Sequence, residues 1–210
     1  NSWLQKVDYF FRDSDYSLTE QHGEEDKHED EDHEEDPTFF KNDAKEYGAV
    51  FDLTNNSFSQ KLVLNFVEED ISIIGAEAFM RPTNNEEQTI GYYVSKELGF
   101  FHLDFGIRHD RISRKGSRSH EQHEGEIEYV DRNIKNTSFA FSLARDINDF
   151  WDINVGLARV ERAPSAVELF MNGPHLATGR FEVGNTNLKS EASNNIDLTF
   201  NYKKSTVCFS

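Results

Sequence analysis

The chain has 210 residues, and its 39 acidic side chains outnumber its 22 basic ones to give a formal net charge of -17 at pH 7. Such a charge disfavours nucleic-acid backbones and anionic lipid head groups as partners, and it is compatible with cationic ligands such as metal ions. The single cysteine excludes a disulfide within the chain. No apolar run approaches the roughly 18 residues of a membrane-spanning helix, but the strands of a membrane barrel need only about ten alternating residues each.

Alternation of apolar and polar side chains is the dominant pattern along the chain, and a period of two is typical of strands with one apolar face. The alternation is clearest at residues 101–108, 139–144, 151–158 and 196–202. In chain order, the sequence predicts eight strands, at residues 2–17, 38–54, 58–67, 88–97, 100–112, 134–145, 150–162 and 191–203.

The connections between these predicted strands alternate between long and short. The long ones are residues 18–37, 68–87, 113–133 and 163–190, and the short ones are residues 54–57, 97–99 and 146–149. Short turns on one side and long loops on the other are typical of outer-membrane barrels, in which the turns are periplasmic and the loops extracellular. We therefore predict an all-β, antiparallel, up-and-down transmembrane β-barrel rather than a β-sandwich.

The two faces of the predicted strands differ in composition. One face carries Phe, Trp, Tyr, Leu and Ile, which suits lipid, and the other carries Asp, Asn, Arg, His and Gly, which suits a wet lumen. Aromatic residues at strand ends, such as Trp3, Phe100 and Trp151, would form girdles at the membrane interfaces. A soluble two-layer core also needs one apolar face, so a soluble metal-binding β-domain remains an alternative.

The segment 20–36 contains three histidines within a nearly continuous run of Asp and Glu. Imidazole and carboxylate groups are the usual nitrogen and oxygen ligands of Zn²⁺. The irregular spacing favours a loop with several weak ligand sets over one rigid tetrahedral site. A solvated acidic loop with incidental histidines is the alternative, and Ca²⁺ is a competing ion that does not need histidine. The candidate metal ligands are His22, Asp26, His28, Asp32 and His33.

A second, smaller group of candidate ligands lies in the predicted loop 113–133, where His120 and His123 stand among acidic residues. The meander places this loop on the same side as segment 20–36, so both are expected at one mouth of the barrel. No nucleophile elbow, phosphate-binding loop, dinucleotide-binding glycine pattern or HExxH motif is present. The sequence therefore offers no catalytic residues, and we do not expect an enzyme.

Residues 161–188 resemble a signature of TonB-dependent outer-membrane receptors, in which an FRAP-like box precedes an NPNL-like box. The first box reads Glu-Arg-Ala-Pro here, with Glu161 where Phe is usual, and the second reads Asn-Thr-Asn-Leu, with Thr186 where Pro is usual. Haem receptors of the family carry a histidine between the boxes, and His175 occupies that position. The matching box residues are Arg162, Ala163, Pro164, Asn185, Asn187 and Leu188.

The resemblance implies a 22-stranded barrel in the bacterial outer membrane, closed by a plug that contacts the TonB complex. This chain would be a partial barrel domain of about eight strands that lacks the plug. The context of His175, the segment 74–83 and the acidic histidine segment look more like the zinc receptors of the family (the ZnuD-like branch). We expect uptake of zinc, with His175 as a further metal ligand. The alternative is uptake of haem or an iron siderophore, in which His175 would bind haem iron.

Overall fold

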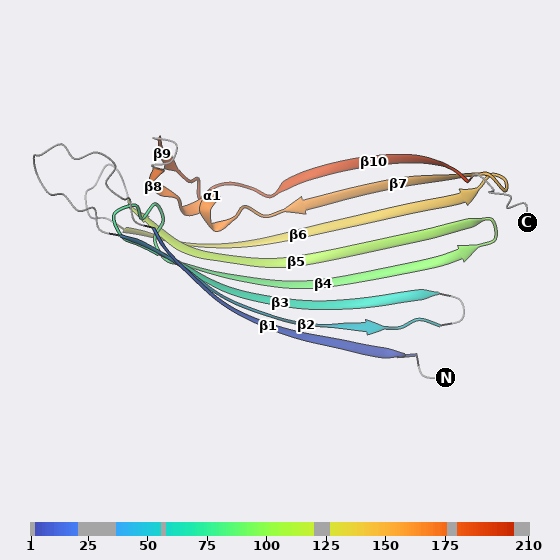
Figure 1. The fold of residues 1–210 in the computed structure, drawn as a ribbon, viewed down its shortest axis with the longest axis horizontal. Helices are drawn as coiled ribbons and strands as arrows, with labels where there is room; N and C mark the ends of the chain where they lie inside the picture. Colours follow the sequence, from blue (N-terminus) through green and yellow to red (C-terminus); the bar gives the residue numbers. More distant parts are fainter. Residues whose placement is uncertain (1–2, 21–36, 56–57, 120–126, 176–179, 204–210) are drawn as a thin grey trace, which may run out of the picture.

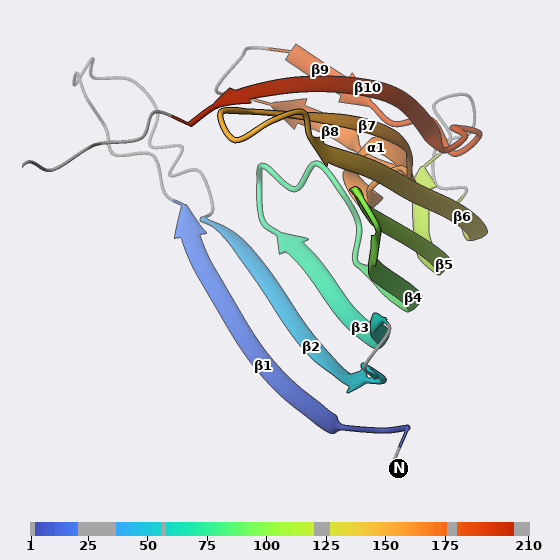
Figure 2. The same ribbon diagram turned by 90° about the vertical axis from the view of Figure 1, so that its right-hand side faces the viewer.

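The computed structural model describes residues 3–20, 37–55, 58–119, 127–175 and 180–203. They form one curved antiparallel sheet of eight strands in the order β1-β2-β3-β4-β5-β6-β7-β10 (Figures 1 and 2). The long strands are β1 (Lys6–Glu20), β2 (Thr38–Asp52), β3 (Ser59–Ile74), β4 (Thr83–Leu98), β5 (Phe101–Ser119), β6 (Ile127–Asp146), β7 (Trp151–Arg162) and β10 (Glu191–Tyr202). Between β7 and β10 lie helix α1 (Ala166–Phe170) and a small hairpin of β8 (Asn172–His175) and β9 (Arg180–Val183). The predicted all-β antiparallel meander of eight strands is confirmed.

The short turns all lie at one end of the sheet and the long connections at the other, as predicted (Figure 1). Gly99 has a φ of 64°, a left-handed conformation that glycine adopts without strain, and it closes the turn between β4 and β5. In the turn between β6 and β7, the Asn148 side chain accepts hydrogen bonds from the backbone N–H groups of Phe150 and Trp151, at 2.9 and 3.1 Å. We refer to the two ends of the sheet as the turn end and the loop end.

The predicted loops are too long, because the strands continue further toward the loop end than the alternation indicates. Residues 18–20 belong to β1, and much of the predicted loops 68–87 and 113–133 belongs to β3, β4, β5 and β6. Beyond the apolar band, the outer face is charged, and the interior face mixes apolar side chains such as Ile73 and Ile112 with polar ones, so the alternation fades. The backbone ladder nevertheless continues, for example from His109↔Thr137 up to Ser119↔Ile127.

The strand register divides the sheet into two faces. On the outer face, one row runs through Phe51, Leu62, Tyr92, Ile107 and Phe139. On the opposite, interior face, a comparable row runs through Asp104, Ser142, Gly156 and Asp197. An exposed apolar face beside a polar one is typical of a membrane barrel wall, with lipid on one side and the lumen on the other.

The apolar band of the outer face has aromatic pairs near both borders. Trp151 and Tyr202 lie 4.9 Å apart, centroid to centroid, at the turn end. Tyr47 and Phe66 stack at 5.2 Å on the loop side of the band. Aromatic side chains of this kind mark the two interfaces of a membrane. Two residues beyond the second pair, the outer face turns charged, in the row Asp13, Lys45, Glu68 and Glu86.

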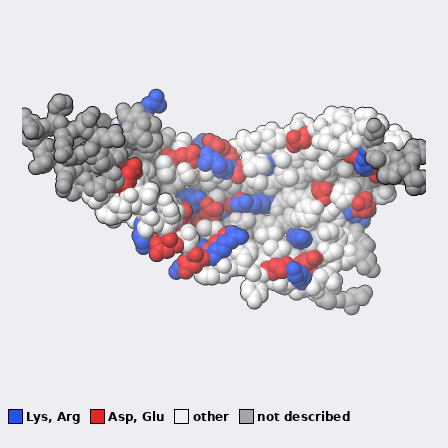
Figure 3. Space-filling view, viewed as in Figure 1, with Lys and Arg blue, Asp and Glu red and all other residues white. Residues whose placement is uncertain are grey.

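The interior face carries acidic and basic side chains interspersed with uncharged ones along its length (Figure 3). Its compact apolar core lies at the loop end and consists of Ile73, Met80, Ala166, Leu169 and Phe170. Gly116 of β5 makes this packing possible, because a Cβ there would come within 2.7 Å of the Phe170 ring. No helix among the described residues is long and apolar enough to cross a membrane.

Candidate functional site

The connection between β7 and β10 contains both sequence boxes and begins with a short, well-capped helix. Ser165 is the N-cap of α1, and its hydroxyl accepts a hydrogen bond from the backbone N–H of Glu168. In return, the Glu168 carboxylate accepts a hydrogen bond from the backbone N–H of Ser165, at 2.7 Å. This reciprocal capping box satisfies two backbone donors and fixes the start of the helix. Leu169 and Phe170 of α1 are almost fully buried against the interior face of the sheet.

Arg162, the arginine of the first box, holds this helix to the strands on either side. Its two terminal nitrogens each donate to one carboxylate oxygen of Glu168, both at 2.9 Å, and its Nε donates to Glu191 of β10 at 3.2 Å. A bidentate contact of this kind fixes orientation as well as charge. The hydrogen bonds from Arg162 and from Ser165 lower the pKa of Glu168 from its ordinary 4.5 to about 2.

The second box lies directly against the first. The backbone N–H of Asn185 donates to the Glu168 carbonyl at 2.9 Å. Arg132 of β6 then fixes the box to the sheet, because its guanidinium donates to the carbonyls of Thr186 and Leu188, the latter at 2.9 Å. The structure therefore brings the two boxes together as one folded unit on the interior face. In the sequence, helix α1 and the β8–β9 hairpin lie between Pro164 and Asn185.

Asn136 of β6 ties both ends of the connection to the sheet. Its side chain is 1% exposed. In the orientation that satisfies its amide, the oxygen accepts from the backbone N–H of Ala163 at 2.8 Å, and the nitrogen donates to the Ser190 hydroxyl at 2.5 Å. Ala163 and Pro164 are themselves buried. The backbone contact of Ala163 and the burial of both residues place the first box directly against the wall.

The β8–β9 hairpin projects from this base at the loop end (Figure 1). Its first residue, Asn172, donates its backbone N–H to the Phe79 carbonyl at 2.7 Å, and Gly184 donates to the Met171 carbonyl at 2.6 Å. The hairpin register places His175 opposite Arg180. His175 therefore lies at the far end of a hairpin whose base is held by several contacts, while its side chain is outside the described part of the structure.

Polar side chains cover the interior face below this unit. Asp110 accepts hydrogen bonds from Thr89 at 2.6 Å and from Arg108 at 2.7 Å. Glu69 accepts from Asn42 at 2.9 Å and from Asn85 at 3.3 Å. The wall is thus lined by charge-assisted hydrogen bonds, which suits contact with water or a polar partner.

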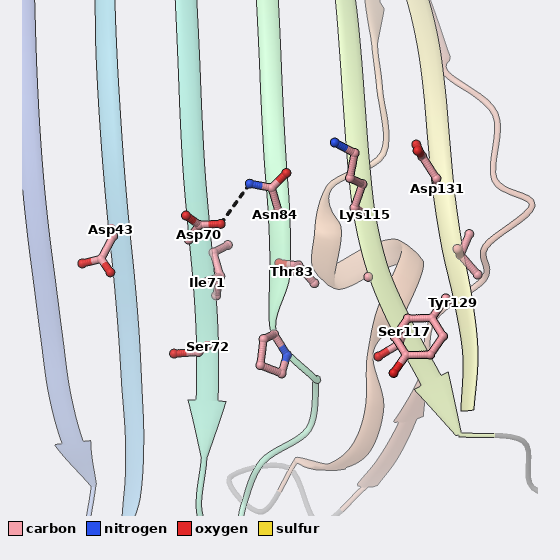
Figure 4. A pocket seen from close by; sticks show the side chains of 13 residues that line it. Asp43, Asp70, Ile71, Ser72, Thr83, Asn84, Lys115, Ser117, Tyr129 and Asp131 are labelled. Carbon is pink, nitrogen blue, oxygen red and sulfur yellow. Dashed lines mark hydrogen bonds between the residues drawn. The ribbon is translucent and has the colours of Figure 1, made fainter. Parts of the chain in front are cut away.

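A hollow of about 520 Å³ opens on the other side of the sheet, at the loop end of β4 (Figure 4). Asp43, Asp70 and Asp131 line it together with Lys115. Asp70 accepts a hydrogen bond from Asn84 at 2.9 Å, and Lys115 donates to Glu86 at 3.0 Å. Two of its charged groups therefore already have hydrogen-bond partners. The hollow lies on the face opposite the two boxes.

The predicted loop ligands His22, Asp26, His28, Asp32, His33, His120 and His123 all lie outside the described residues. Within the described ranges, no group of three or more His, Cys, Asp or Glu side chains is arranged to hold a metal ion. The metal site stays a prediction from the sequence.

Sequence analysis missed the residues that hold the boxes in place. Arg132 and Asn136 belong to a strand in which polar residues alternate on both faces, and nothing in the local pattern distinguishes them from solvated side chains. Phe79 and Met80 come from a segment predicted to be loop, yet Met80 is 3% exposed and belongs to the interior core. The occurrence of Phe79 and Met80 within a predicted outer loop was the available signal that this segment packs against the sheet.

Two comparisons with known proteins agree with this architecture. The family model described as TonB dependent receptor-like, beta-barrel, matches residues 1–207. The fold is similar to that of the hemophore receptor HasR of Serratia marcescens, solved as a double mutant in complex with its hemophore HasA and heme. The TM-score is 0.65 at 16% sequence identity, over 83% of this chain and 33% of the HasR chain. The chain thus spans about a third of that receptor, and at this identity the likeness concerns the fold.

Proposed function

Because the chain belongs to the TonB-dependent receptor β-barrel family, we propose that it forms part of the wall of an outer-membrane uptake receptor. The family is located in the outer membrane and consists of transport receptors rather than enzymes. The observation that supports an uptake role is the folded connection between β7 and β10, which is held on the interior face by Arg132, Asn136 and Arg162. A hairpin on such a base would contact cargo at the loop end, and a plug linked to the TonB complex would release it inward.

Zinc is the cargo that we propose first. Segment 20–36 supplies three histidines among many carboxylates, which is a ligand set suited to Zn²⁺. The net charge of -17 would raise the local concentration of a divalent cation and lower that of an anionic cargo. His22, His28 and His33 would collect the ion, and His175 would hold it further inward.

Haem is the second candidate, and one observation favours it. His175 lies in the hairpin between the two boxes, and the similar receptor HasR was solved with heme. In this case, His175 would be an axial ligand of haem iron, and the acidic segment would not take part in binding.

The test is a pair of titrations on the complete receptor in detergent. Zinc binding is measured by calorimetry and hemin binding by the Soret absorbance, for the wild type, for the triple variant His22→Ala, His28→Ala, His33→Ala, and for His175→Ala. The zinc proposal predicts that zinc heat falls in the triple variant while hemin causes no saturable change. A matched control is His109→Ala, because His109 contacts Thr137 at 2.9 Å on the outer face and should affect neither ligand.

The opposite pattern would replace the zinc proposal by the haem proposal. In that pattern, hemin binds with a saturable Soret change that His175→Ala abolishes, and the zinc heat is the same in the wild type and in the triple variant. Absence of both ligands' binding in a folded receptor would reject both cargoes and leave the uptake role to other substrates.

A further inference from the structure

Two basic residues face each other across adjacent strands, and no described carboxylate lies against them. Arg111 of β5 is paired in register with Lys135 of β6, and both are exposed. Side chains in such a facing pair have Cβ atoms about 5 Å apart, and like charges there destabilise the sheet. Neither side chain has a hydrogen-bond or ion-pair partner among the residues that the structure describes. The sheet therefore keeps an unfavourable contact that an anion between the two groups would relieve.

The described residues around the pair do not supply that anion. Gln88 is the neutral neighbour of Arg111 on β4. Glu161 is the acidic group on the neighbouring β7, but its carboxylate already accepts from the backbone N–H of Thr137 at 2.9 Å and from Arg159 at 3.1 Å. The Arg111–Lys135 pair is thus a local positive site on the outer face of a strongly acidic chain.

The position of the pair along the strands, relative to the apolar band, indicates what binds there. Four residues toward the turn end on the same strands, Ile107 and Phe139 face each other on the same side of the sheet, and they are 40% and 42% exposed. Below them follows the facing pair Phe105 and Phe141. The facing pair His109 and Thr137 separates the two cations from this apolar wall. The cations lie in the same row as the aromatic stack of Tyr47 and Phe66, which marks the border of the band. A lipid with an anionic head group above its acyl chains matches this surface, because its negative charge would lie beside the two cations and its chains beside the apolar wall.

We propose that Arg111 and Lys135 bind the phosphate of an outer-leaflet lipid whose acyl chains lie along Ile107, Phe139 and Phe105. The overall charge of the chain disfavours anionic head groups. This site is a local exception, because the described carboxylates of the outer face lie elsewhere or already have partners. The proposal concerns the anchoring of the barrel in the membrane and does not depend on which cargo is transported.

The experiment compares lipid binding by the complete receptor and by the double variant Arg111→Gln, Lys135→Gln. Native mass spectrometry in detergent gives the affinity for lipid A, for enzymatically dephosphorylated lipid A and for inorganic phosphate alone. The variant should bind lipid A roughly thirtyfold more weakly, a factor of about five for each charge removed. Heat-dependent mobility on gels checks that both proteins are folded.

A matched control is the double variant Lys41→Gln, Lys45→Gln, which removes the same charge from the same face. Lys41 is paired with Asp43 at 2.7 Å, and Lys45 stands between Asp13 and Glu68 in the register, so lipid A binding should not change. Phosphate alone should bind far more weakly than lipid A, because the apolar contacts are missing. Three results would overturn the proposal: equal lipid A binding in wild type and the Arg111/Lys135 variant, an equal loss in the control variant, or equal binding of the dephosphorylated lipid.

Discussion

The turn-end and loop-end halves of the sheet are built from the same strands, but they are stabilised differently. In the turn-end half, the apolar side chains point outward, as in the row Leu103, Leu143, Val155 and Leu198, and the interior face is polar. In the loop-end half, the outer face is charged, and the apolar core lies on the interior face around Phe170. The apolar surface thus changes sides along the strands, which indicates that lipid covers the first half and that the protein must bury its own apolar groups in the second.

The largest effect is expected from Phe170→Ala, which removes the centre of the loop-end core. Phe170 is 1% exposed and packs against Gly116 of β5. Loss of a buried phenyl ring costs about 3–5 kcal/mol, and the cost should fall on the docking of residues 163–188. Hydrogen exchange by mass spectrometry should show lost protection there and unchanged protection in the turn-end parts of β2 and β3, which lie away from this core. Val167→Ala, on the exposed side of the same helix, is the control, and equal deprotection by both variants would mean that α1 does not depend on this core.

A smaller but still large effect is expected from a charge placed within the apolar band. Leu143→Arg puts a guanidinium on the outer face in the middle of the band, which costs roughly 2–4 kcal/mol near the centre of a bilayer. Asn133→Arg, on the same face of the same strand beyond the band, should change stability by less than about 0.5 kcal/mol. Guanidinium-induced unfolding in lipid vesicles measures both. If the two variants are equally stable, the band is not in contact with lipid.

The turn-end half could be predicted closely from the sequence, because lipid on one side and water on the other imposes a strict period of two. For this reason, the predicted bounds of β7 and β10, 150–162 and 191–203, differ from the observed bounds by no more than one residue. The largest error in this half is the start of β1, which is predicted at residue 2 and lies at Lys6. In the loop-end half, the strands are solvated or covered by their own chain, so hydrophobic pattern no longer reports pairing. The extension of β3 to Ile74 and of β5 to Ser119 follows from the backbone ladder, which the side chains do not encode.

The candidate site was predictable in its position but not in its construction. The two boxes were recognisable as motifs, and the structure brings them together through the Asn185 N–H and the Glu168 carbonyl. Their attachment to the wall by Arg132 and Asn136 depends on contacts across more than 25 residues of sequence. Such long-range pairs are set by the sheet register, which a single sequence leaves undetermined.

The smallest expected effect tests the electrostatic part of the same unit. The pKa of Glu168 is lowered to about 2 by its hydrogen bonds with Arg162 and Ser165, so its carboxylate stabilises the folded connection above pH 4.5. That contribution should be lost as the pH falls from 4.5 toward 2, because the folded state then also binds the proton. Glu168 is 38% exposed, so solvent screening keeps the effect small. Pepsin cleavage of the connection between β7 and β10 should be faster in Glu168→Gln than in wild type near pH 4.5, and the ratio should approach one near pH 2. Because both proteins meet the same protease at each pH, the ratio removes the pH dependence of pepsin, and a ratio that stays constant would mean that the Arg162–Glu168 contact does not contribute to stability.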